Sequence, residues 1–450
     1  MGEHRLMTAR SNPHGPFRGT LVGLVLTGLL ALVPAAASAK TFEVTKRGDP
    51  APGACTPADC SLREAVVAAN ARPGNDVIRL VARKPYRLTR SSSDPGAEED
   101  QGDLEAGVAI NEVGNAIRIK HPGRGRAVID AEGADDRAFE VNGQLTLVKI
   151  TIRGGHANSG GEAGGGIYGA GRVVLKRSLI AGNLAGDVGA GVYMGVGNLV
   201  VTRSTIRGND GGEGGGIFIG TSGVLRMTRS TVSGNEAPNG AGGIGLANGA
   251  PGGSVIQTST LEGNLSGSDG GGIENGSAGL RIVNTTIARN SAEARGGGIH
   301  ARPGSFLRMN AATVARNRAD SDDSGGPETG GGLYGDGGSD VIEARNSLIA
   351  LNRILGGVLN ECDAPAPVGI ESLGGNLISD DVNGCTFFGS DDYVQANPRI
   401  GQLAKNGGPT RTMAIRKQSA AVNHADGPNP PKRDQRGVKR KNPDIGAYER

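Results

Sequence analysis

The chain has 450 residues, a formal net charge of +3, no Trp and only 3% aromatic residues. Its 79 glycines follow no strict three-residue period, which excludes collagen, and the near-neutral charge excludes a basic footprint for nucleic acid. Apolar residues still reach 36%, so we expect a core built from small branched side chains.

The first 39 residues have the pattern of an export signal. Basic residues precede an apolar run from Leu21 to Val33, and Ala37-Ser38-Ala39 fits a cleavage site. Thirteen apolar residues are too few to cross a bilayer. We therefore expect residues 1–39 to be a signal peptide, and the mature chain to be secreted or bound to the cell envelope without a transmembrane segment.

Residues 40–75 are predicted to form an N-terminal cap with a short helix. Ser61 and Glu64 form a capping box before an amphipathic run that starts at Leu62. Residues 76–150 contain strand-like pieces that indicate irregular coils, interrupted by a polar, acidic stretch at 91–105 that we expect to be a loop or a disordered insertion.

Four cysteines lie outside the repeats described below. An even number in an exported chain favours disulfides, most simply Cys55–Cys60 and Cys362–Cys385. A zinc site is the alternative, but no His flanks either pair at ligand spacing.

Between residues 164 and 352 a glycine-rich clamp followed by an aliphatic residue recurs seven times. The closing aliphatic residues are 25, 25, 27, 29, 26 and 34 residues apart: Ile167, Val192, Ile217, Ile244, Ile273, Ile299 and Leu333. A repeat of this length is one supersecondary unit that must stack on its neighbours to bury its apolar face.

Each repeat ends at an asparagine, with aliphatic residues at fixed positions before it. The asparagines are Asn183, Asn209, Asn235, Asn264, Asn290, Asn317 and Asn352. Apolar residues at period-two spacing indicate about three short inward-facing strands per repeat. We expect each asparagine to adopt the left-handed backbone region at a turn and to hydrogen-bond to the asparagine of the next coil.

These patterns predict an all-β chain. We expect a parallel β-helix over residues 76–360. Its hand should be right, because connections between parallel strands of one sheet are right-handed. The short N-terminal helix caps one end, and residues 361–450 form an irregular C-terminal cap region, because open strand edges need covering.

Three separated segments resemble a known family: CTPADCSLREAVVAAN at 55–70, NPRIGQLAKNGGPTRTMAI at 397–415 and DQRGVKRKNPDIGAYE at 434–449. Together they look like the secreted bacterial choice-of-anchor Q domain proteins, which are related to polymorphic outer-membrane-type repeats. The resemblance implies export and a right-handed parallel β-helix, and it implies no established reaction.

The residue after each clamp aliphatic should point outward on the first strand of its coil. This outward row contains Tyr168, Tyr193, Phe218, Gly245, Glu274, His300 and Tyr334. Aromatic side chains in a row suit sugar rings, so the four aromatic residues are candidate ligand contacts. Glu274 and His300 are candidates for acid–base chemistry. The alternative is that outward positions on a solvated sheet simply vary.

Acidic residues recur after the asparagines, at Asp187, Asp210, Glu213, Glu236, Asp269, Glu293, Asp320, Asp322 and Asp323. Such a stripe could bind Ca²⁺ through its oxygens, but we favour a solvated edge and expect no obligatory cofactor or metal. Arg177, Arg203 and Arg229 also align, and we expect them to pair with carboxylates.

The leading functional hypothesis is a non-catalytic, exported β-helix that binds a polysaccharide or cell-surface glycan, because no catalytic constellation is assembled. A polysaccharide lyase or glycoside hydrolase is the alternative, and a structural spacer is a third. The sequence predicts no nucleic-acid partner and leaves the oligomeric state open.

Overall fold

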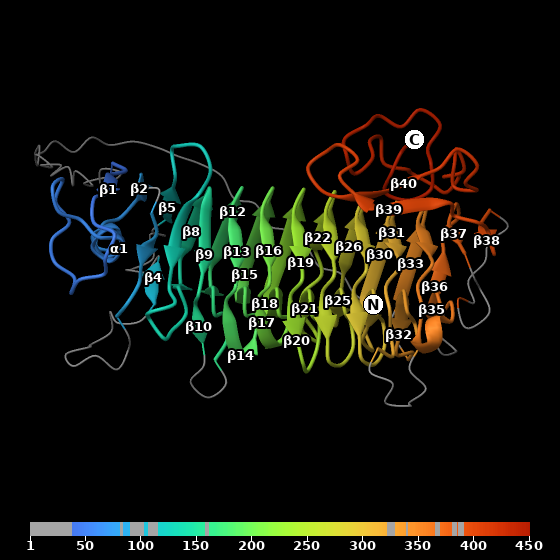
Figure 1. Ribbon diagram of the computed structural model, residues 1–450, viewed down its shortest axis with the longest axis horizontal. Helices are drawn as coiled ribbons and strands as arrows, with labels where there is room; N and C mark the ends of the chain where they lie inside the picture. The colour runs from blue at the N-terminus through green and yellow to red at the C-terminus, as the bar shows by residue number, and fades with distance from the viewer. Residues whose placement is uncertain are drawn as a thin grey trace, which may run out of the picture. The chain divides into compact units, whose positions relative to one another are not determined.

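The computed structural model describes residues 38–450 except 82–83, 91–102, 107–115, 158–161, 322–328, 339–340, 365–369, 380–384 and 386–390. The predicted signal peptide, except its last two residues, lies outside the described residues, as do Asp322 and Asp323. The described chain is a parallel β-helix whose coils stack along one axis (Figure 1). No helix among these residues is long and apolar enough to cross a membrane.

The long, 20-stranded sheet carries two strands from most coils. Its first column contains β4 (Leu104–Ala106), β7 (Phe139–Val141), β11 (Ile167–Gly169), β15 (Val192–Thr202), β18 (Ile217–Thr228), β21 (Ile244–Leu246), β25 (Ile273–Asn275), β29 (Ile299–Ala301), β32 (Leu333–Gly335) and β35 (Cys362–Asp363). Its second column contains β1 (Thr41–Val44), β2 (Asn75–Leu80), β5 (Ala116–Lys120), β8 (Gln144–Val148), β12 (Arg172–Lys176), β22 (Ser254–Gln257), β26 (Leu280–Val283), β30 (Phe306–Asn310), β33 (Val341–Arg345) and β36 (Ile370–Ser372). The long strands β15 and β18 run through both columns.

Two further parallel sheets complete each coil. The 12-stranded sheet contains β3 (Tyr86–Arg87), β6 (Ala127–Asp130), β9 (Ile150–Arg153), β13 (Leu179–Ala181), β16 (Thr205–Arg207), β19 (Thr231–Ser233), β23 (Thr260–Glu262), β27 (Thr286–Ala288), β31 (Thr313–Ala315), β34 (Leu348–Ala350), β37 (Leu377–Ile378) and β38 (Tyr393–Val394). The six-stranded sheet contains β10 (His156–Ala157), β14 (Leu184–Val188), β17 (Asp210–Glu213), β20 (Glu236–Ala237), β24 (Leu265–Ser266) and β28 (Ser291–Ala292). A 3₁₀ turn, η1 (Leu355–Gly357), follows β34.

The core is the set of inward rows that the repeat predicts. The row of aliphatic residues three positions before each asparagine is fully buried, from Ile180 through Ile206 and Val232 to Ile349. Because each coil places an equivalent side chain over the last one, apolar area is buried continuously along the axis. The all-β prediction is therefore confirmed, with one α-helix among the described residues.

The asparagine ladder is present, with one correction. Asn183 Nδ2 donates to Asn209 Oδ1 at 2.8 Å, and the same bond repeats from coil to coil as far as Asn352. Asn352 in turn donates to Glu361 Oε2 at 2.7 Å. The left-handed residue is the one before each asparagine, such as Gly182 with φ +65°, because the asparagine must keep its amide aligned with the stack.

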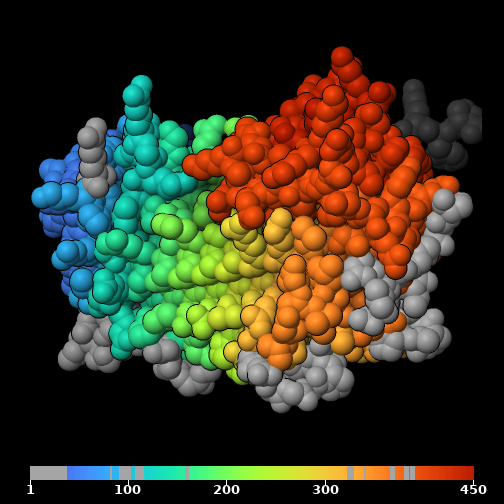
Figure 2. All heavy atoms as spheres, turned by 45° about the vertical axis from the view of Figure 1, so that its right-hand side comes forward, coloured from blue at the N-terminus to red at the C-terminus, as the bar shows by residue number. Residues whose placement is uncertain are grey.

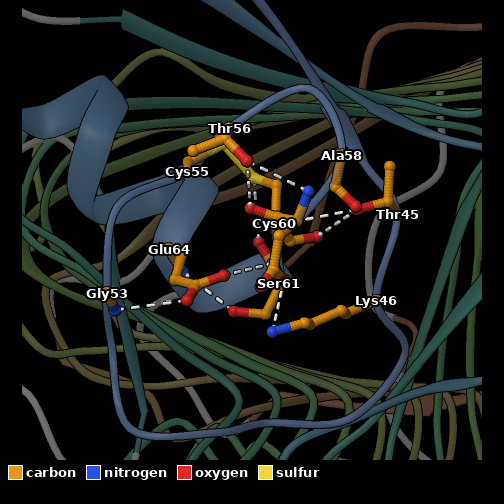
Figure 3. Close-up of a disulfide and its surroundings, with 10 residues drawn as sticks. Thr45, Lys46, Gly53, Cys55, Thr56, Ala58, Cys60, Ser61 and Glu64 are labelled. Carbon is orange, nitrogen blue, oxygen red and sulfur yellow. Dashed lines mark hydrogen bonds and ion pairs between the residues drawn. A yellow bond between two sulfur atoms is a disulfide. The ribbon is translucent and has the colours of Figure 1, made fainter.

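The N-terminal helix α1 (Leu62–Asn70) begins with the predicted capping box, in which Ser61 N donates to Glu64 Oε2 at 2.6 Å and Glu64 N donates to Ser61 Oγ at 3.2 Å. The Cys55–Cys60 disulfide closes the loop that leads into it (Figure 3). Arg63 is buried and forms an ion pair with Asp49 at 2.8 Å. Helix α1 packs against the first coils, next to β1, β2 and β4.

Strand pairing extends beyond the expected β-helix range of 76–360. Strand β1 already pairs with β2 in parallel, and β36, β37 and β38 continue the stack to Val394. The end of the acidic stretch at 91–105, expected to be a loop, contributes to strand β4, because Leu104 and Ala106 are buried.

The last 50 residues lie along the side of the coils (Figures 1 and 2), whereas the sequence suggested a cover for the open end. The antiparallel pair β39 (Ile400–Ala404) and β40 (Thr412–Ile415) belongs to this segment. It packs on Ala288, Ala315 and Ala350 of the 12-stranded sheet. Threonines of that sheet anchor it: Thr260 Oγ1 donates to the carbonyl of Arg411 at 2.6 Å. Small outward side chains on these coils make room for the segment.

Candidate functional site

The outward row follows the predicted order in the structure. Tyr168 pairs with Tyr193, Tyr193 with Phe218, Phe218 with Gly245, Gly245 with Glu274, Glu274 with His300, and His300 with Tyr334. The row also extends beyond the clamps, to Glu140 and Glu105 on one side and Asp363 on the other. Its members lie one coil apart, or about 4.8 Å.

Tyr168, Tyr193 and Phe218 form a continuous aromatic patch on three neighbouring coils. The ring centroids of Tyr168 and Tyr193 are 5.1 Å apart, and those of Tyr193 and Phe218 are 6.2 Å apart. All three side chains are half-buried. Gly245 has no side chain, and an added Cβ there would lie 2.7 Å from the Phe218 ring. The glycine therefore makes space for that ring.

The patch offers ring edges and two hydroxyl groups to a ligand. Neighbouring rings partly face one another, so their faces are not fully open. Within the described part of the chain, neither the Tyr168 nor the Tyr193 hydroxyl makes a hydrogen bond. The surface thus combines apolar area with groups that can hydrogen-bond a polar ligand.

Tyr334 does not belong to this patch, although the sequence grouped the four aromatic residues together. Three row positions separate it from Phe218. The Arg295 guanidinium lies 4.9 Å from the Tyr334 ring centroid and donates to its hydroxyl at 3.4 Å. Tyr334 is thus engaged by Arg295 and by the neighbouring His300 ring, whose centroid lies 5.6 Å away.

Glu274 and His300 lie side by side but are covered, whereas the sequence predicted exposed positions. Their side chains are only 6% and 2% exposed. Asp269, Arg295, Arg302 and Asp336 surround them from turns before and after the strands. A strand pattern tells which face a residue takes, but not which turn side chains fold over that face.

His300 is held between carboxylates. Its Nε2 lies 2.9 Å from Asp336 Oδ2, and its Nδ1 lies 3.4 Å from Glu274 Oε1 and 3.8 Å from Asp269 Oδ2. Burial lowers the pKa of His300, but the hydrogen bond to Asp336 and the nearby carboxylates of Glu274 and Asp269 outweigh it and raise that pKa to about 9. The protonated form is therefore favoured at neutral pH.

The carboxylates of this cluster are paired as well. Arg295 makes a bidentate contact with Asp269, through Nε at 3.1 Å and Nη2 at 2.9 Å, and also reaches Asp336 at 2.9 Å. Arg302 Nε donates to Glu274 Oε1. In this arrangement Arg302 holds Glu274, and Asp336 holds one of the two ring nitrogens of His300.

A second charged cluster lies at the other end of the aromatic patch, and the sequence reasoning missed it. Arg137 contacts Glu140 at 3.0 Å and Glu162 at 3.3 Å, and its guanidinium lies 5.1 Å from the Tyr168 ring centroid. Burial, followed by the charge of Asp136, raises the pKa of Asp103 to about 7. The early coils lack the glycine clamp, so no repeat signal marked these positions.

Other predicted sites lie apart from the row. Asp210 and Glu236 pair with each other in the six-stranded sheet and are exposed, whereas Asp269 is buried in the His300 cluster. The acidic residues therefore do not form a single stripe. Arg177, Arg203 and Arg229 adopt left-handed backbone conformations, and no ion pair of theirs occurs among the described residues. These arginines therefore occupy turn positions, and the expected pairing with carboxylates is not seen for them in the described part of the chain.

Two connected hollows of about 650 and 730 Å³ lie over the turn between the 12-stranded and six-stranded sheets. They share Ala181, Gly182 and Arg207. The glycine before each asparagine lines them, and later coils place Arg289 and Arg316 at the same left-handed position. We refer to this channel, lined by Gly182, Gly208, Gly234 and Gly263, as the glycine groove.

Both predicted disulfides are present. Cys55 pairs with Cys60 and Cys362 with Cys385, with Cα–Cα distances of 4.4 and 5.2 Å, and no described cysteine is free. The second bridge ties β35 (Cys362–Asp363) to the segment that leads into β38.

Comparison with known proteins bears on the fold. A family model described as the right-handed β-helix region matches residues 108–261, in agreement with the predicted hand. Among solved structures, the crystal structure of pectate lyase Pel9A is similar, with a TM-score of 0.45 and 14% identity, and the match covers 92% of this chain and 98% of that chain. A search of the curated proteins finds no match.

Proposed function

We propose that this chain is an exported, non-catalytic β-helix that binds a glycan of the cell envelope through its aromatic patch. The observation that carries the proposal is the placement of Tyr168, Tyr193 and Phe218 on three neighbouring coils, half-buried and in register. A long glycan can lie along the axis of the coils and meet several equivalent positions. Sugar-binding surfaces combine such apolar contact with a few polar groups.

Charged groups next to the patch supply the polar part of this surface. Arg137 lies against the Tyr168 ring and contacts Glu140 and Glu162. Arg and carboxylate side chains at the edge of an aromatic patch can hydrogen-bond sugar hydroxyls without performing chemistry on them. The resemblance to choice-of-anchor Q proteins supports a place outside the cytoplasm, as do two disulfides.

The His300 cluster supports a non-catalytic role. The acid–base candidates Glu274 and His300 are buried and paired with Arg302, Asp269 and Asp336. A catalytic pKa is most effective near the working pH, whereas the surrounding carboxylates raise the pKa of His300 to about 9. These contacts stabilise a resting ion-pair network.

The proposal is tested by glycan-array binding and affinity electrophoresis of the mature protein. We expect Tyr193→Ala and Phe218→Ala each to reduce glycan retention at least tenfold. The matched control is Tyr393→Ala, because Tyr393 is also a partly buried aromatic residue but stacks on His424, away from the row. Equal binding by all three variants would contradict the proposal, and a complete lack of glycan binding would favour a structural spacer.

A polysaccharide lyase or hydrolase is the second candidate, and the Asp103 cluster favours it. Asp103, whose pKa is raised to about 7, lies 3.8 Å from Arg137, the residue that contacts the Tyr168 ring. Its carboxyl group could donate a proton to a sugar bound there. Assays for reducing ends and unsaturated products on a polysaccharide panel distinguish the candidates. Turnover that Asp103→Asn, Glu274→Gln or His300→Ala abolishes would replace the binding proposal with an enzymatic one.

A further inference from the structure

The buried cluster around His300 brings three potential metal ligands together. The ligand atoms of Asp269, Glu274 and His300 all lie within 4.8 Å of one another. We infer that these three residues form a binding site for a first-row transition-metal dication, with Zn²⁺ as its probe. The site is separate from the aromatic patch and does not depend on the glycan proposal.

The distances suit a small tetrahedral ion. Metal–ligand bonds of about 2.1 Å in tetrahedral geometry place neighbouring ligand atoms about 3.4 Å apart. His300 Nδ1 lies 3.4 Å from Glu274 Oε1 and 3.8 Å from Asp269 Oδ2. Small side-chain adjustments therefore bring all three ligands to bonding distance.

The second argument is the state of the His300 ring. Nδ1 is buried and makes no hydrogen bond, although the side chain is only 2% exposed. The other nitrogen, Nε2, lies 2.9 Å from Asp336 Oδ2. A carboxylate on the far nitrogen fixes the ring and its tautomer in most metal-binding histidines. Asp336 thus leaves Nδ1 as the nitrogen that faces the two carboxylates.

The carboxylate ligands are oriented in the same way. Arg295 holds Asp269 through two side-chain hydrogen bonds and its backbone N–H, and Arg302 holds Glu274. Because these contacts fix both side chains before an ion arrives, less conformational entropy is lost on binding.

The local charge also fits a dication. Asp269, Glu274 and Asp336 carry three negative charges, and Arg295 and Arg302 carry two positive charges. A metal ion that binds Nδ1 displaces the proton of His300, so the residues around the ion then sum to −1. Glu213 lies next to Glu274, since an added Cβ at Gly240 would meet both side chains at 3.0 and 3.1 Å. Glu213 thus adds a further carboxyl group beside the site.

The donor set determines the class of metal. Calcium prefers six to eight oxygen ligands, whereas an imidazole ligand suits zinc and its neighbours, which also bind carboxylates. The ligands come from the turn before β25, from β25 and from β29. A bound ion would therefore link two successive coils across the row.

The test is isothermal titration calorimetry of the chelator-treated full chain, made without a histidine tag, with ZnCl₂ and in parallel with CaCl₂. We expect one Zn²⁺ per chain and much weaker Ca²⁺ binding. His300→Gln and Glu274→Gln should each weaken Zn²⁺ binding at least a hundredfold. Asp336→Asn should weaken it about ten- to a hundredfold, because it positions the ring. The control is His424→Gln, which changes a histidine of the C-terminal segment that stacks on Tyr393.

Circular dichroism establishes that each variant is folded, and the visible spectrum of the Co²⁺-loaded wild type reports the ligands independently of any variant. Stoichiometric binding that is lost in the ligand variants but kept in His424→Gln supports the site. Failure of the wild type to bind Zn²⁺ stoichiometrically, or unchanged affinity in His300→Gln, overturns it.

Discussion

The asparagine ladder should be a main source of stability, and Asn264 tests this. Asn264 is 1% exposed. Its Nδ2 donates to Val232 O at 3.2 Å and Asn290 Oδ1 at 2.8 Å, and its Oδ1 accepts from the backbone N and the Nδ2 of Asn235 at 3.1 and 2.9 Å. Asn264→Ala removes all four bonds.

The expected loss of stability depends on which buried groups keep a hydrogen-bond partner in the variant. Asn235 Nδ2 still reaches Ile206 O, and Asn290 Oδ1 still accepts from the backbone of residue 264. The Asn235 backbone N–H loses its partner, and Val232 O loses one donor. An unsatisfied buried group costs about 1–3 kcal/mol and each lost hydrogen bond about 1 kcal/mol. We therefore expect Asn264→Ala to lower the free energy of unfolding by about 3–5 kcal/mol.

Guanidinium denaturation followed by circular dichroism measures this loss, provided that the slope of the transition is unchanged. Asn264→Asp should be at least as harmful, because it keeps the acceptors, removes both side-chain donors and buries a charge. The matched control is Asn239→Ala, an exposed asparagine one coil earlier. If Asn264→Ala falls within about 1 kcal/mol of that control, the ladder is not a main source of stability and the reasoning fails.

Three further predictions follow from other parts of the chain. The pKa of Asp103 is raised to about 7 from 3.8, so the folded state keeps a proton that the unfolded state releases above about pH 4. The free energy of unfolding should therefore fall as pH rises from 4 to 7. Asp103→Asn should flatten this part of a stability–pH curve, whereas an unchanged curve would show that Asp103 ionises normally. The Cys362–Cys385 bridge closes a loop of 23 residues and the Cys55–Cys60 bridge one of 5. Chain entropy therefore predicts that replacing each pair by Ser lowers the free energy of unfolding by about 3 and about 2 kcal/mol, respectively. Denaturation curves with the opposite order would contradict the entropic account. Gly234→Asn fills the glycine groove at a left-handed position that Asn tolerates, and it should leave glycan retention on affinity gels unchanged; loss of retention would move the proposed glycan site from the aromatic patch to the groove.

The core of this protein could be predicted because its sequence pattern repeats. The glycine clamps, the inward aliphatic rows and the terminal asparagines recur at nearly fixed spacing, so stacking alone places them. Gly166 shows how strict the constraint is: an added Cβ would lie 2.4 Å from the carbonyl oxygen of Gly191 on the next coil. The same stacking aligned Tyr168, Tyr193 and Phe218 correctly.

The sequence pattern could not predict contacts between segments that do not repeat. The covering of Glu274 and His300 depends on turn residues such as Arg295 and Asp336, whose direction follows no period. The side-on position of the last 50 residues depends on Thr260 and Thr286, whose hydroxyls donate hydrogen bonds to Arg411 O and Gln435 Oε1, 151 and 149 residues away. The charged cluster at Asp103 lies in coils without a clamp, where neither register nor burial could be inferred.

At one position of the coil the fold fixes the backbone conformation but not the side chain. The residue before each asparagine must adopt a left-handed conformation, and both Gly234 and Arg289 do so, with φ of +56° and +60°. The backbone thus fixes the conformation but leaves the side chain open. Outward row positions behave alike, since Phe218, Gly245 and Glu274 occupy equivalent places on successive strands. The row changes from aromatic residues to a buried Glu–His cluster, and this variation is what the proposed glycan site at one end and the proposed metal site at the other require.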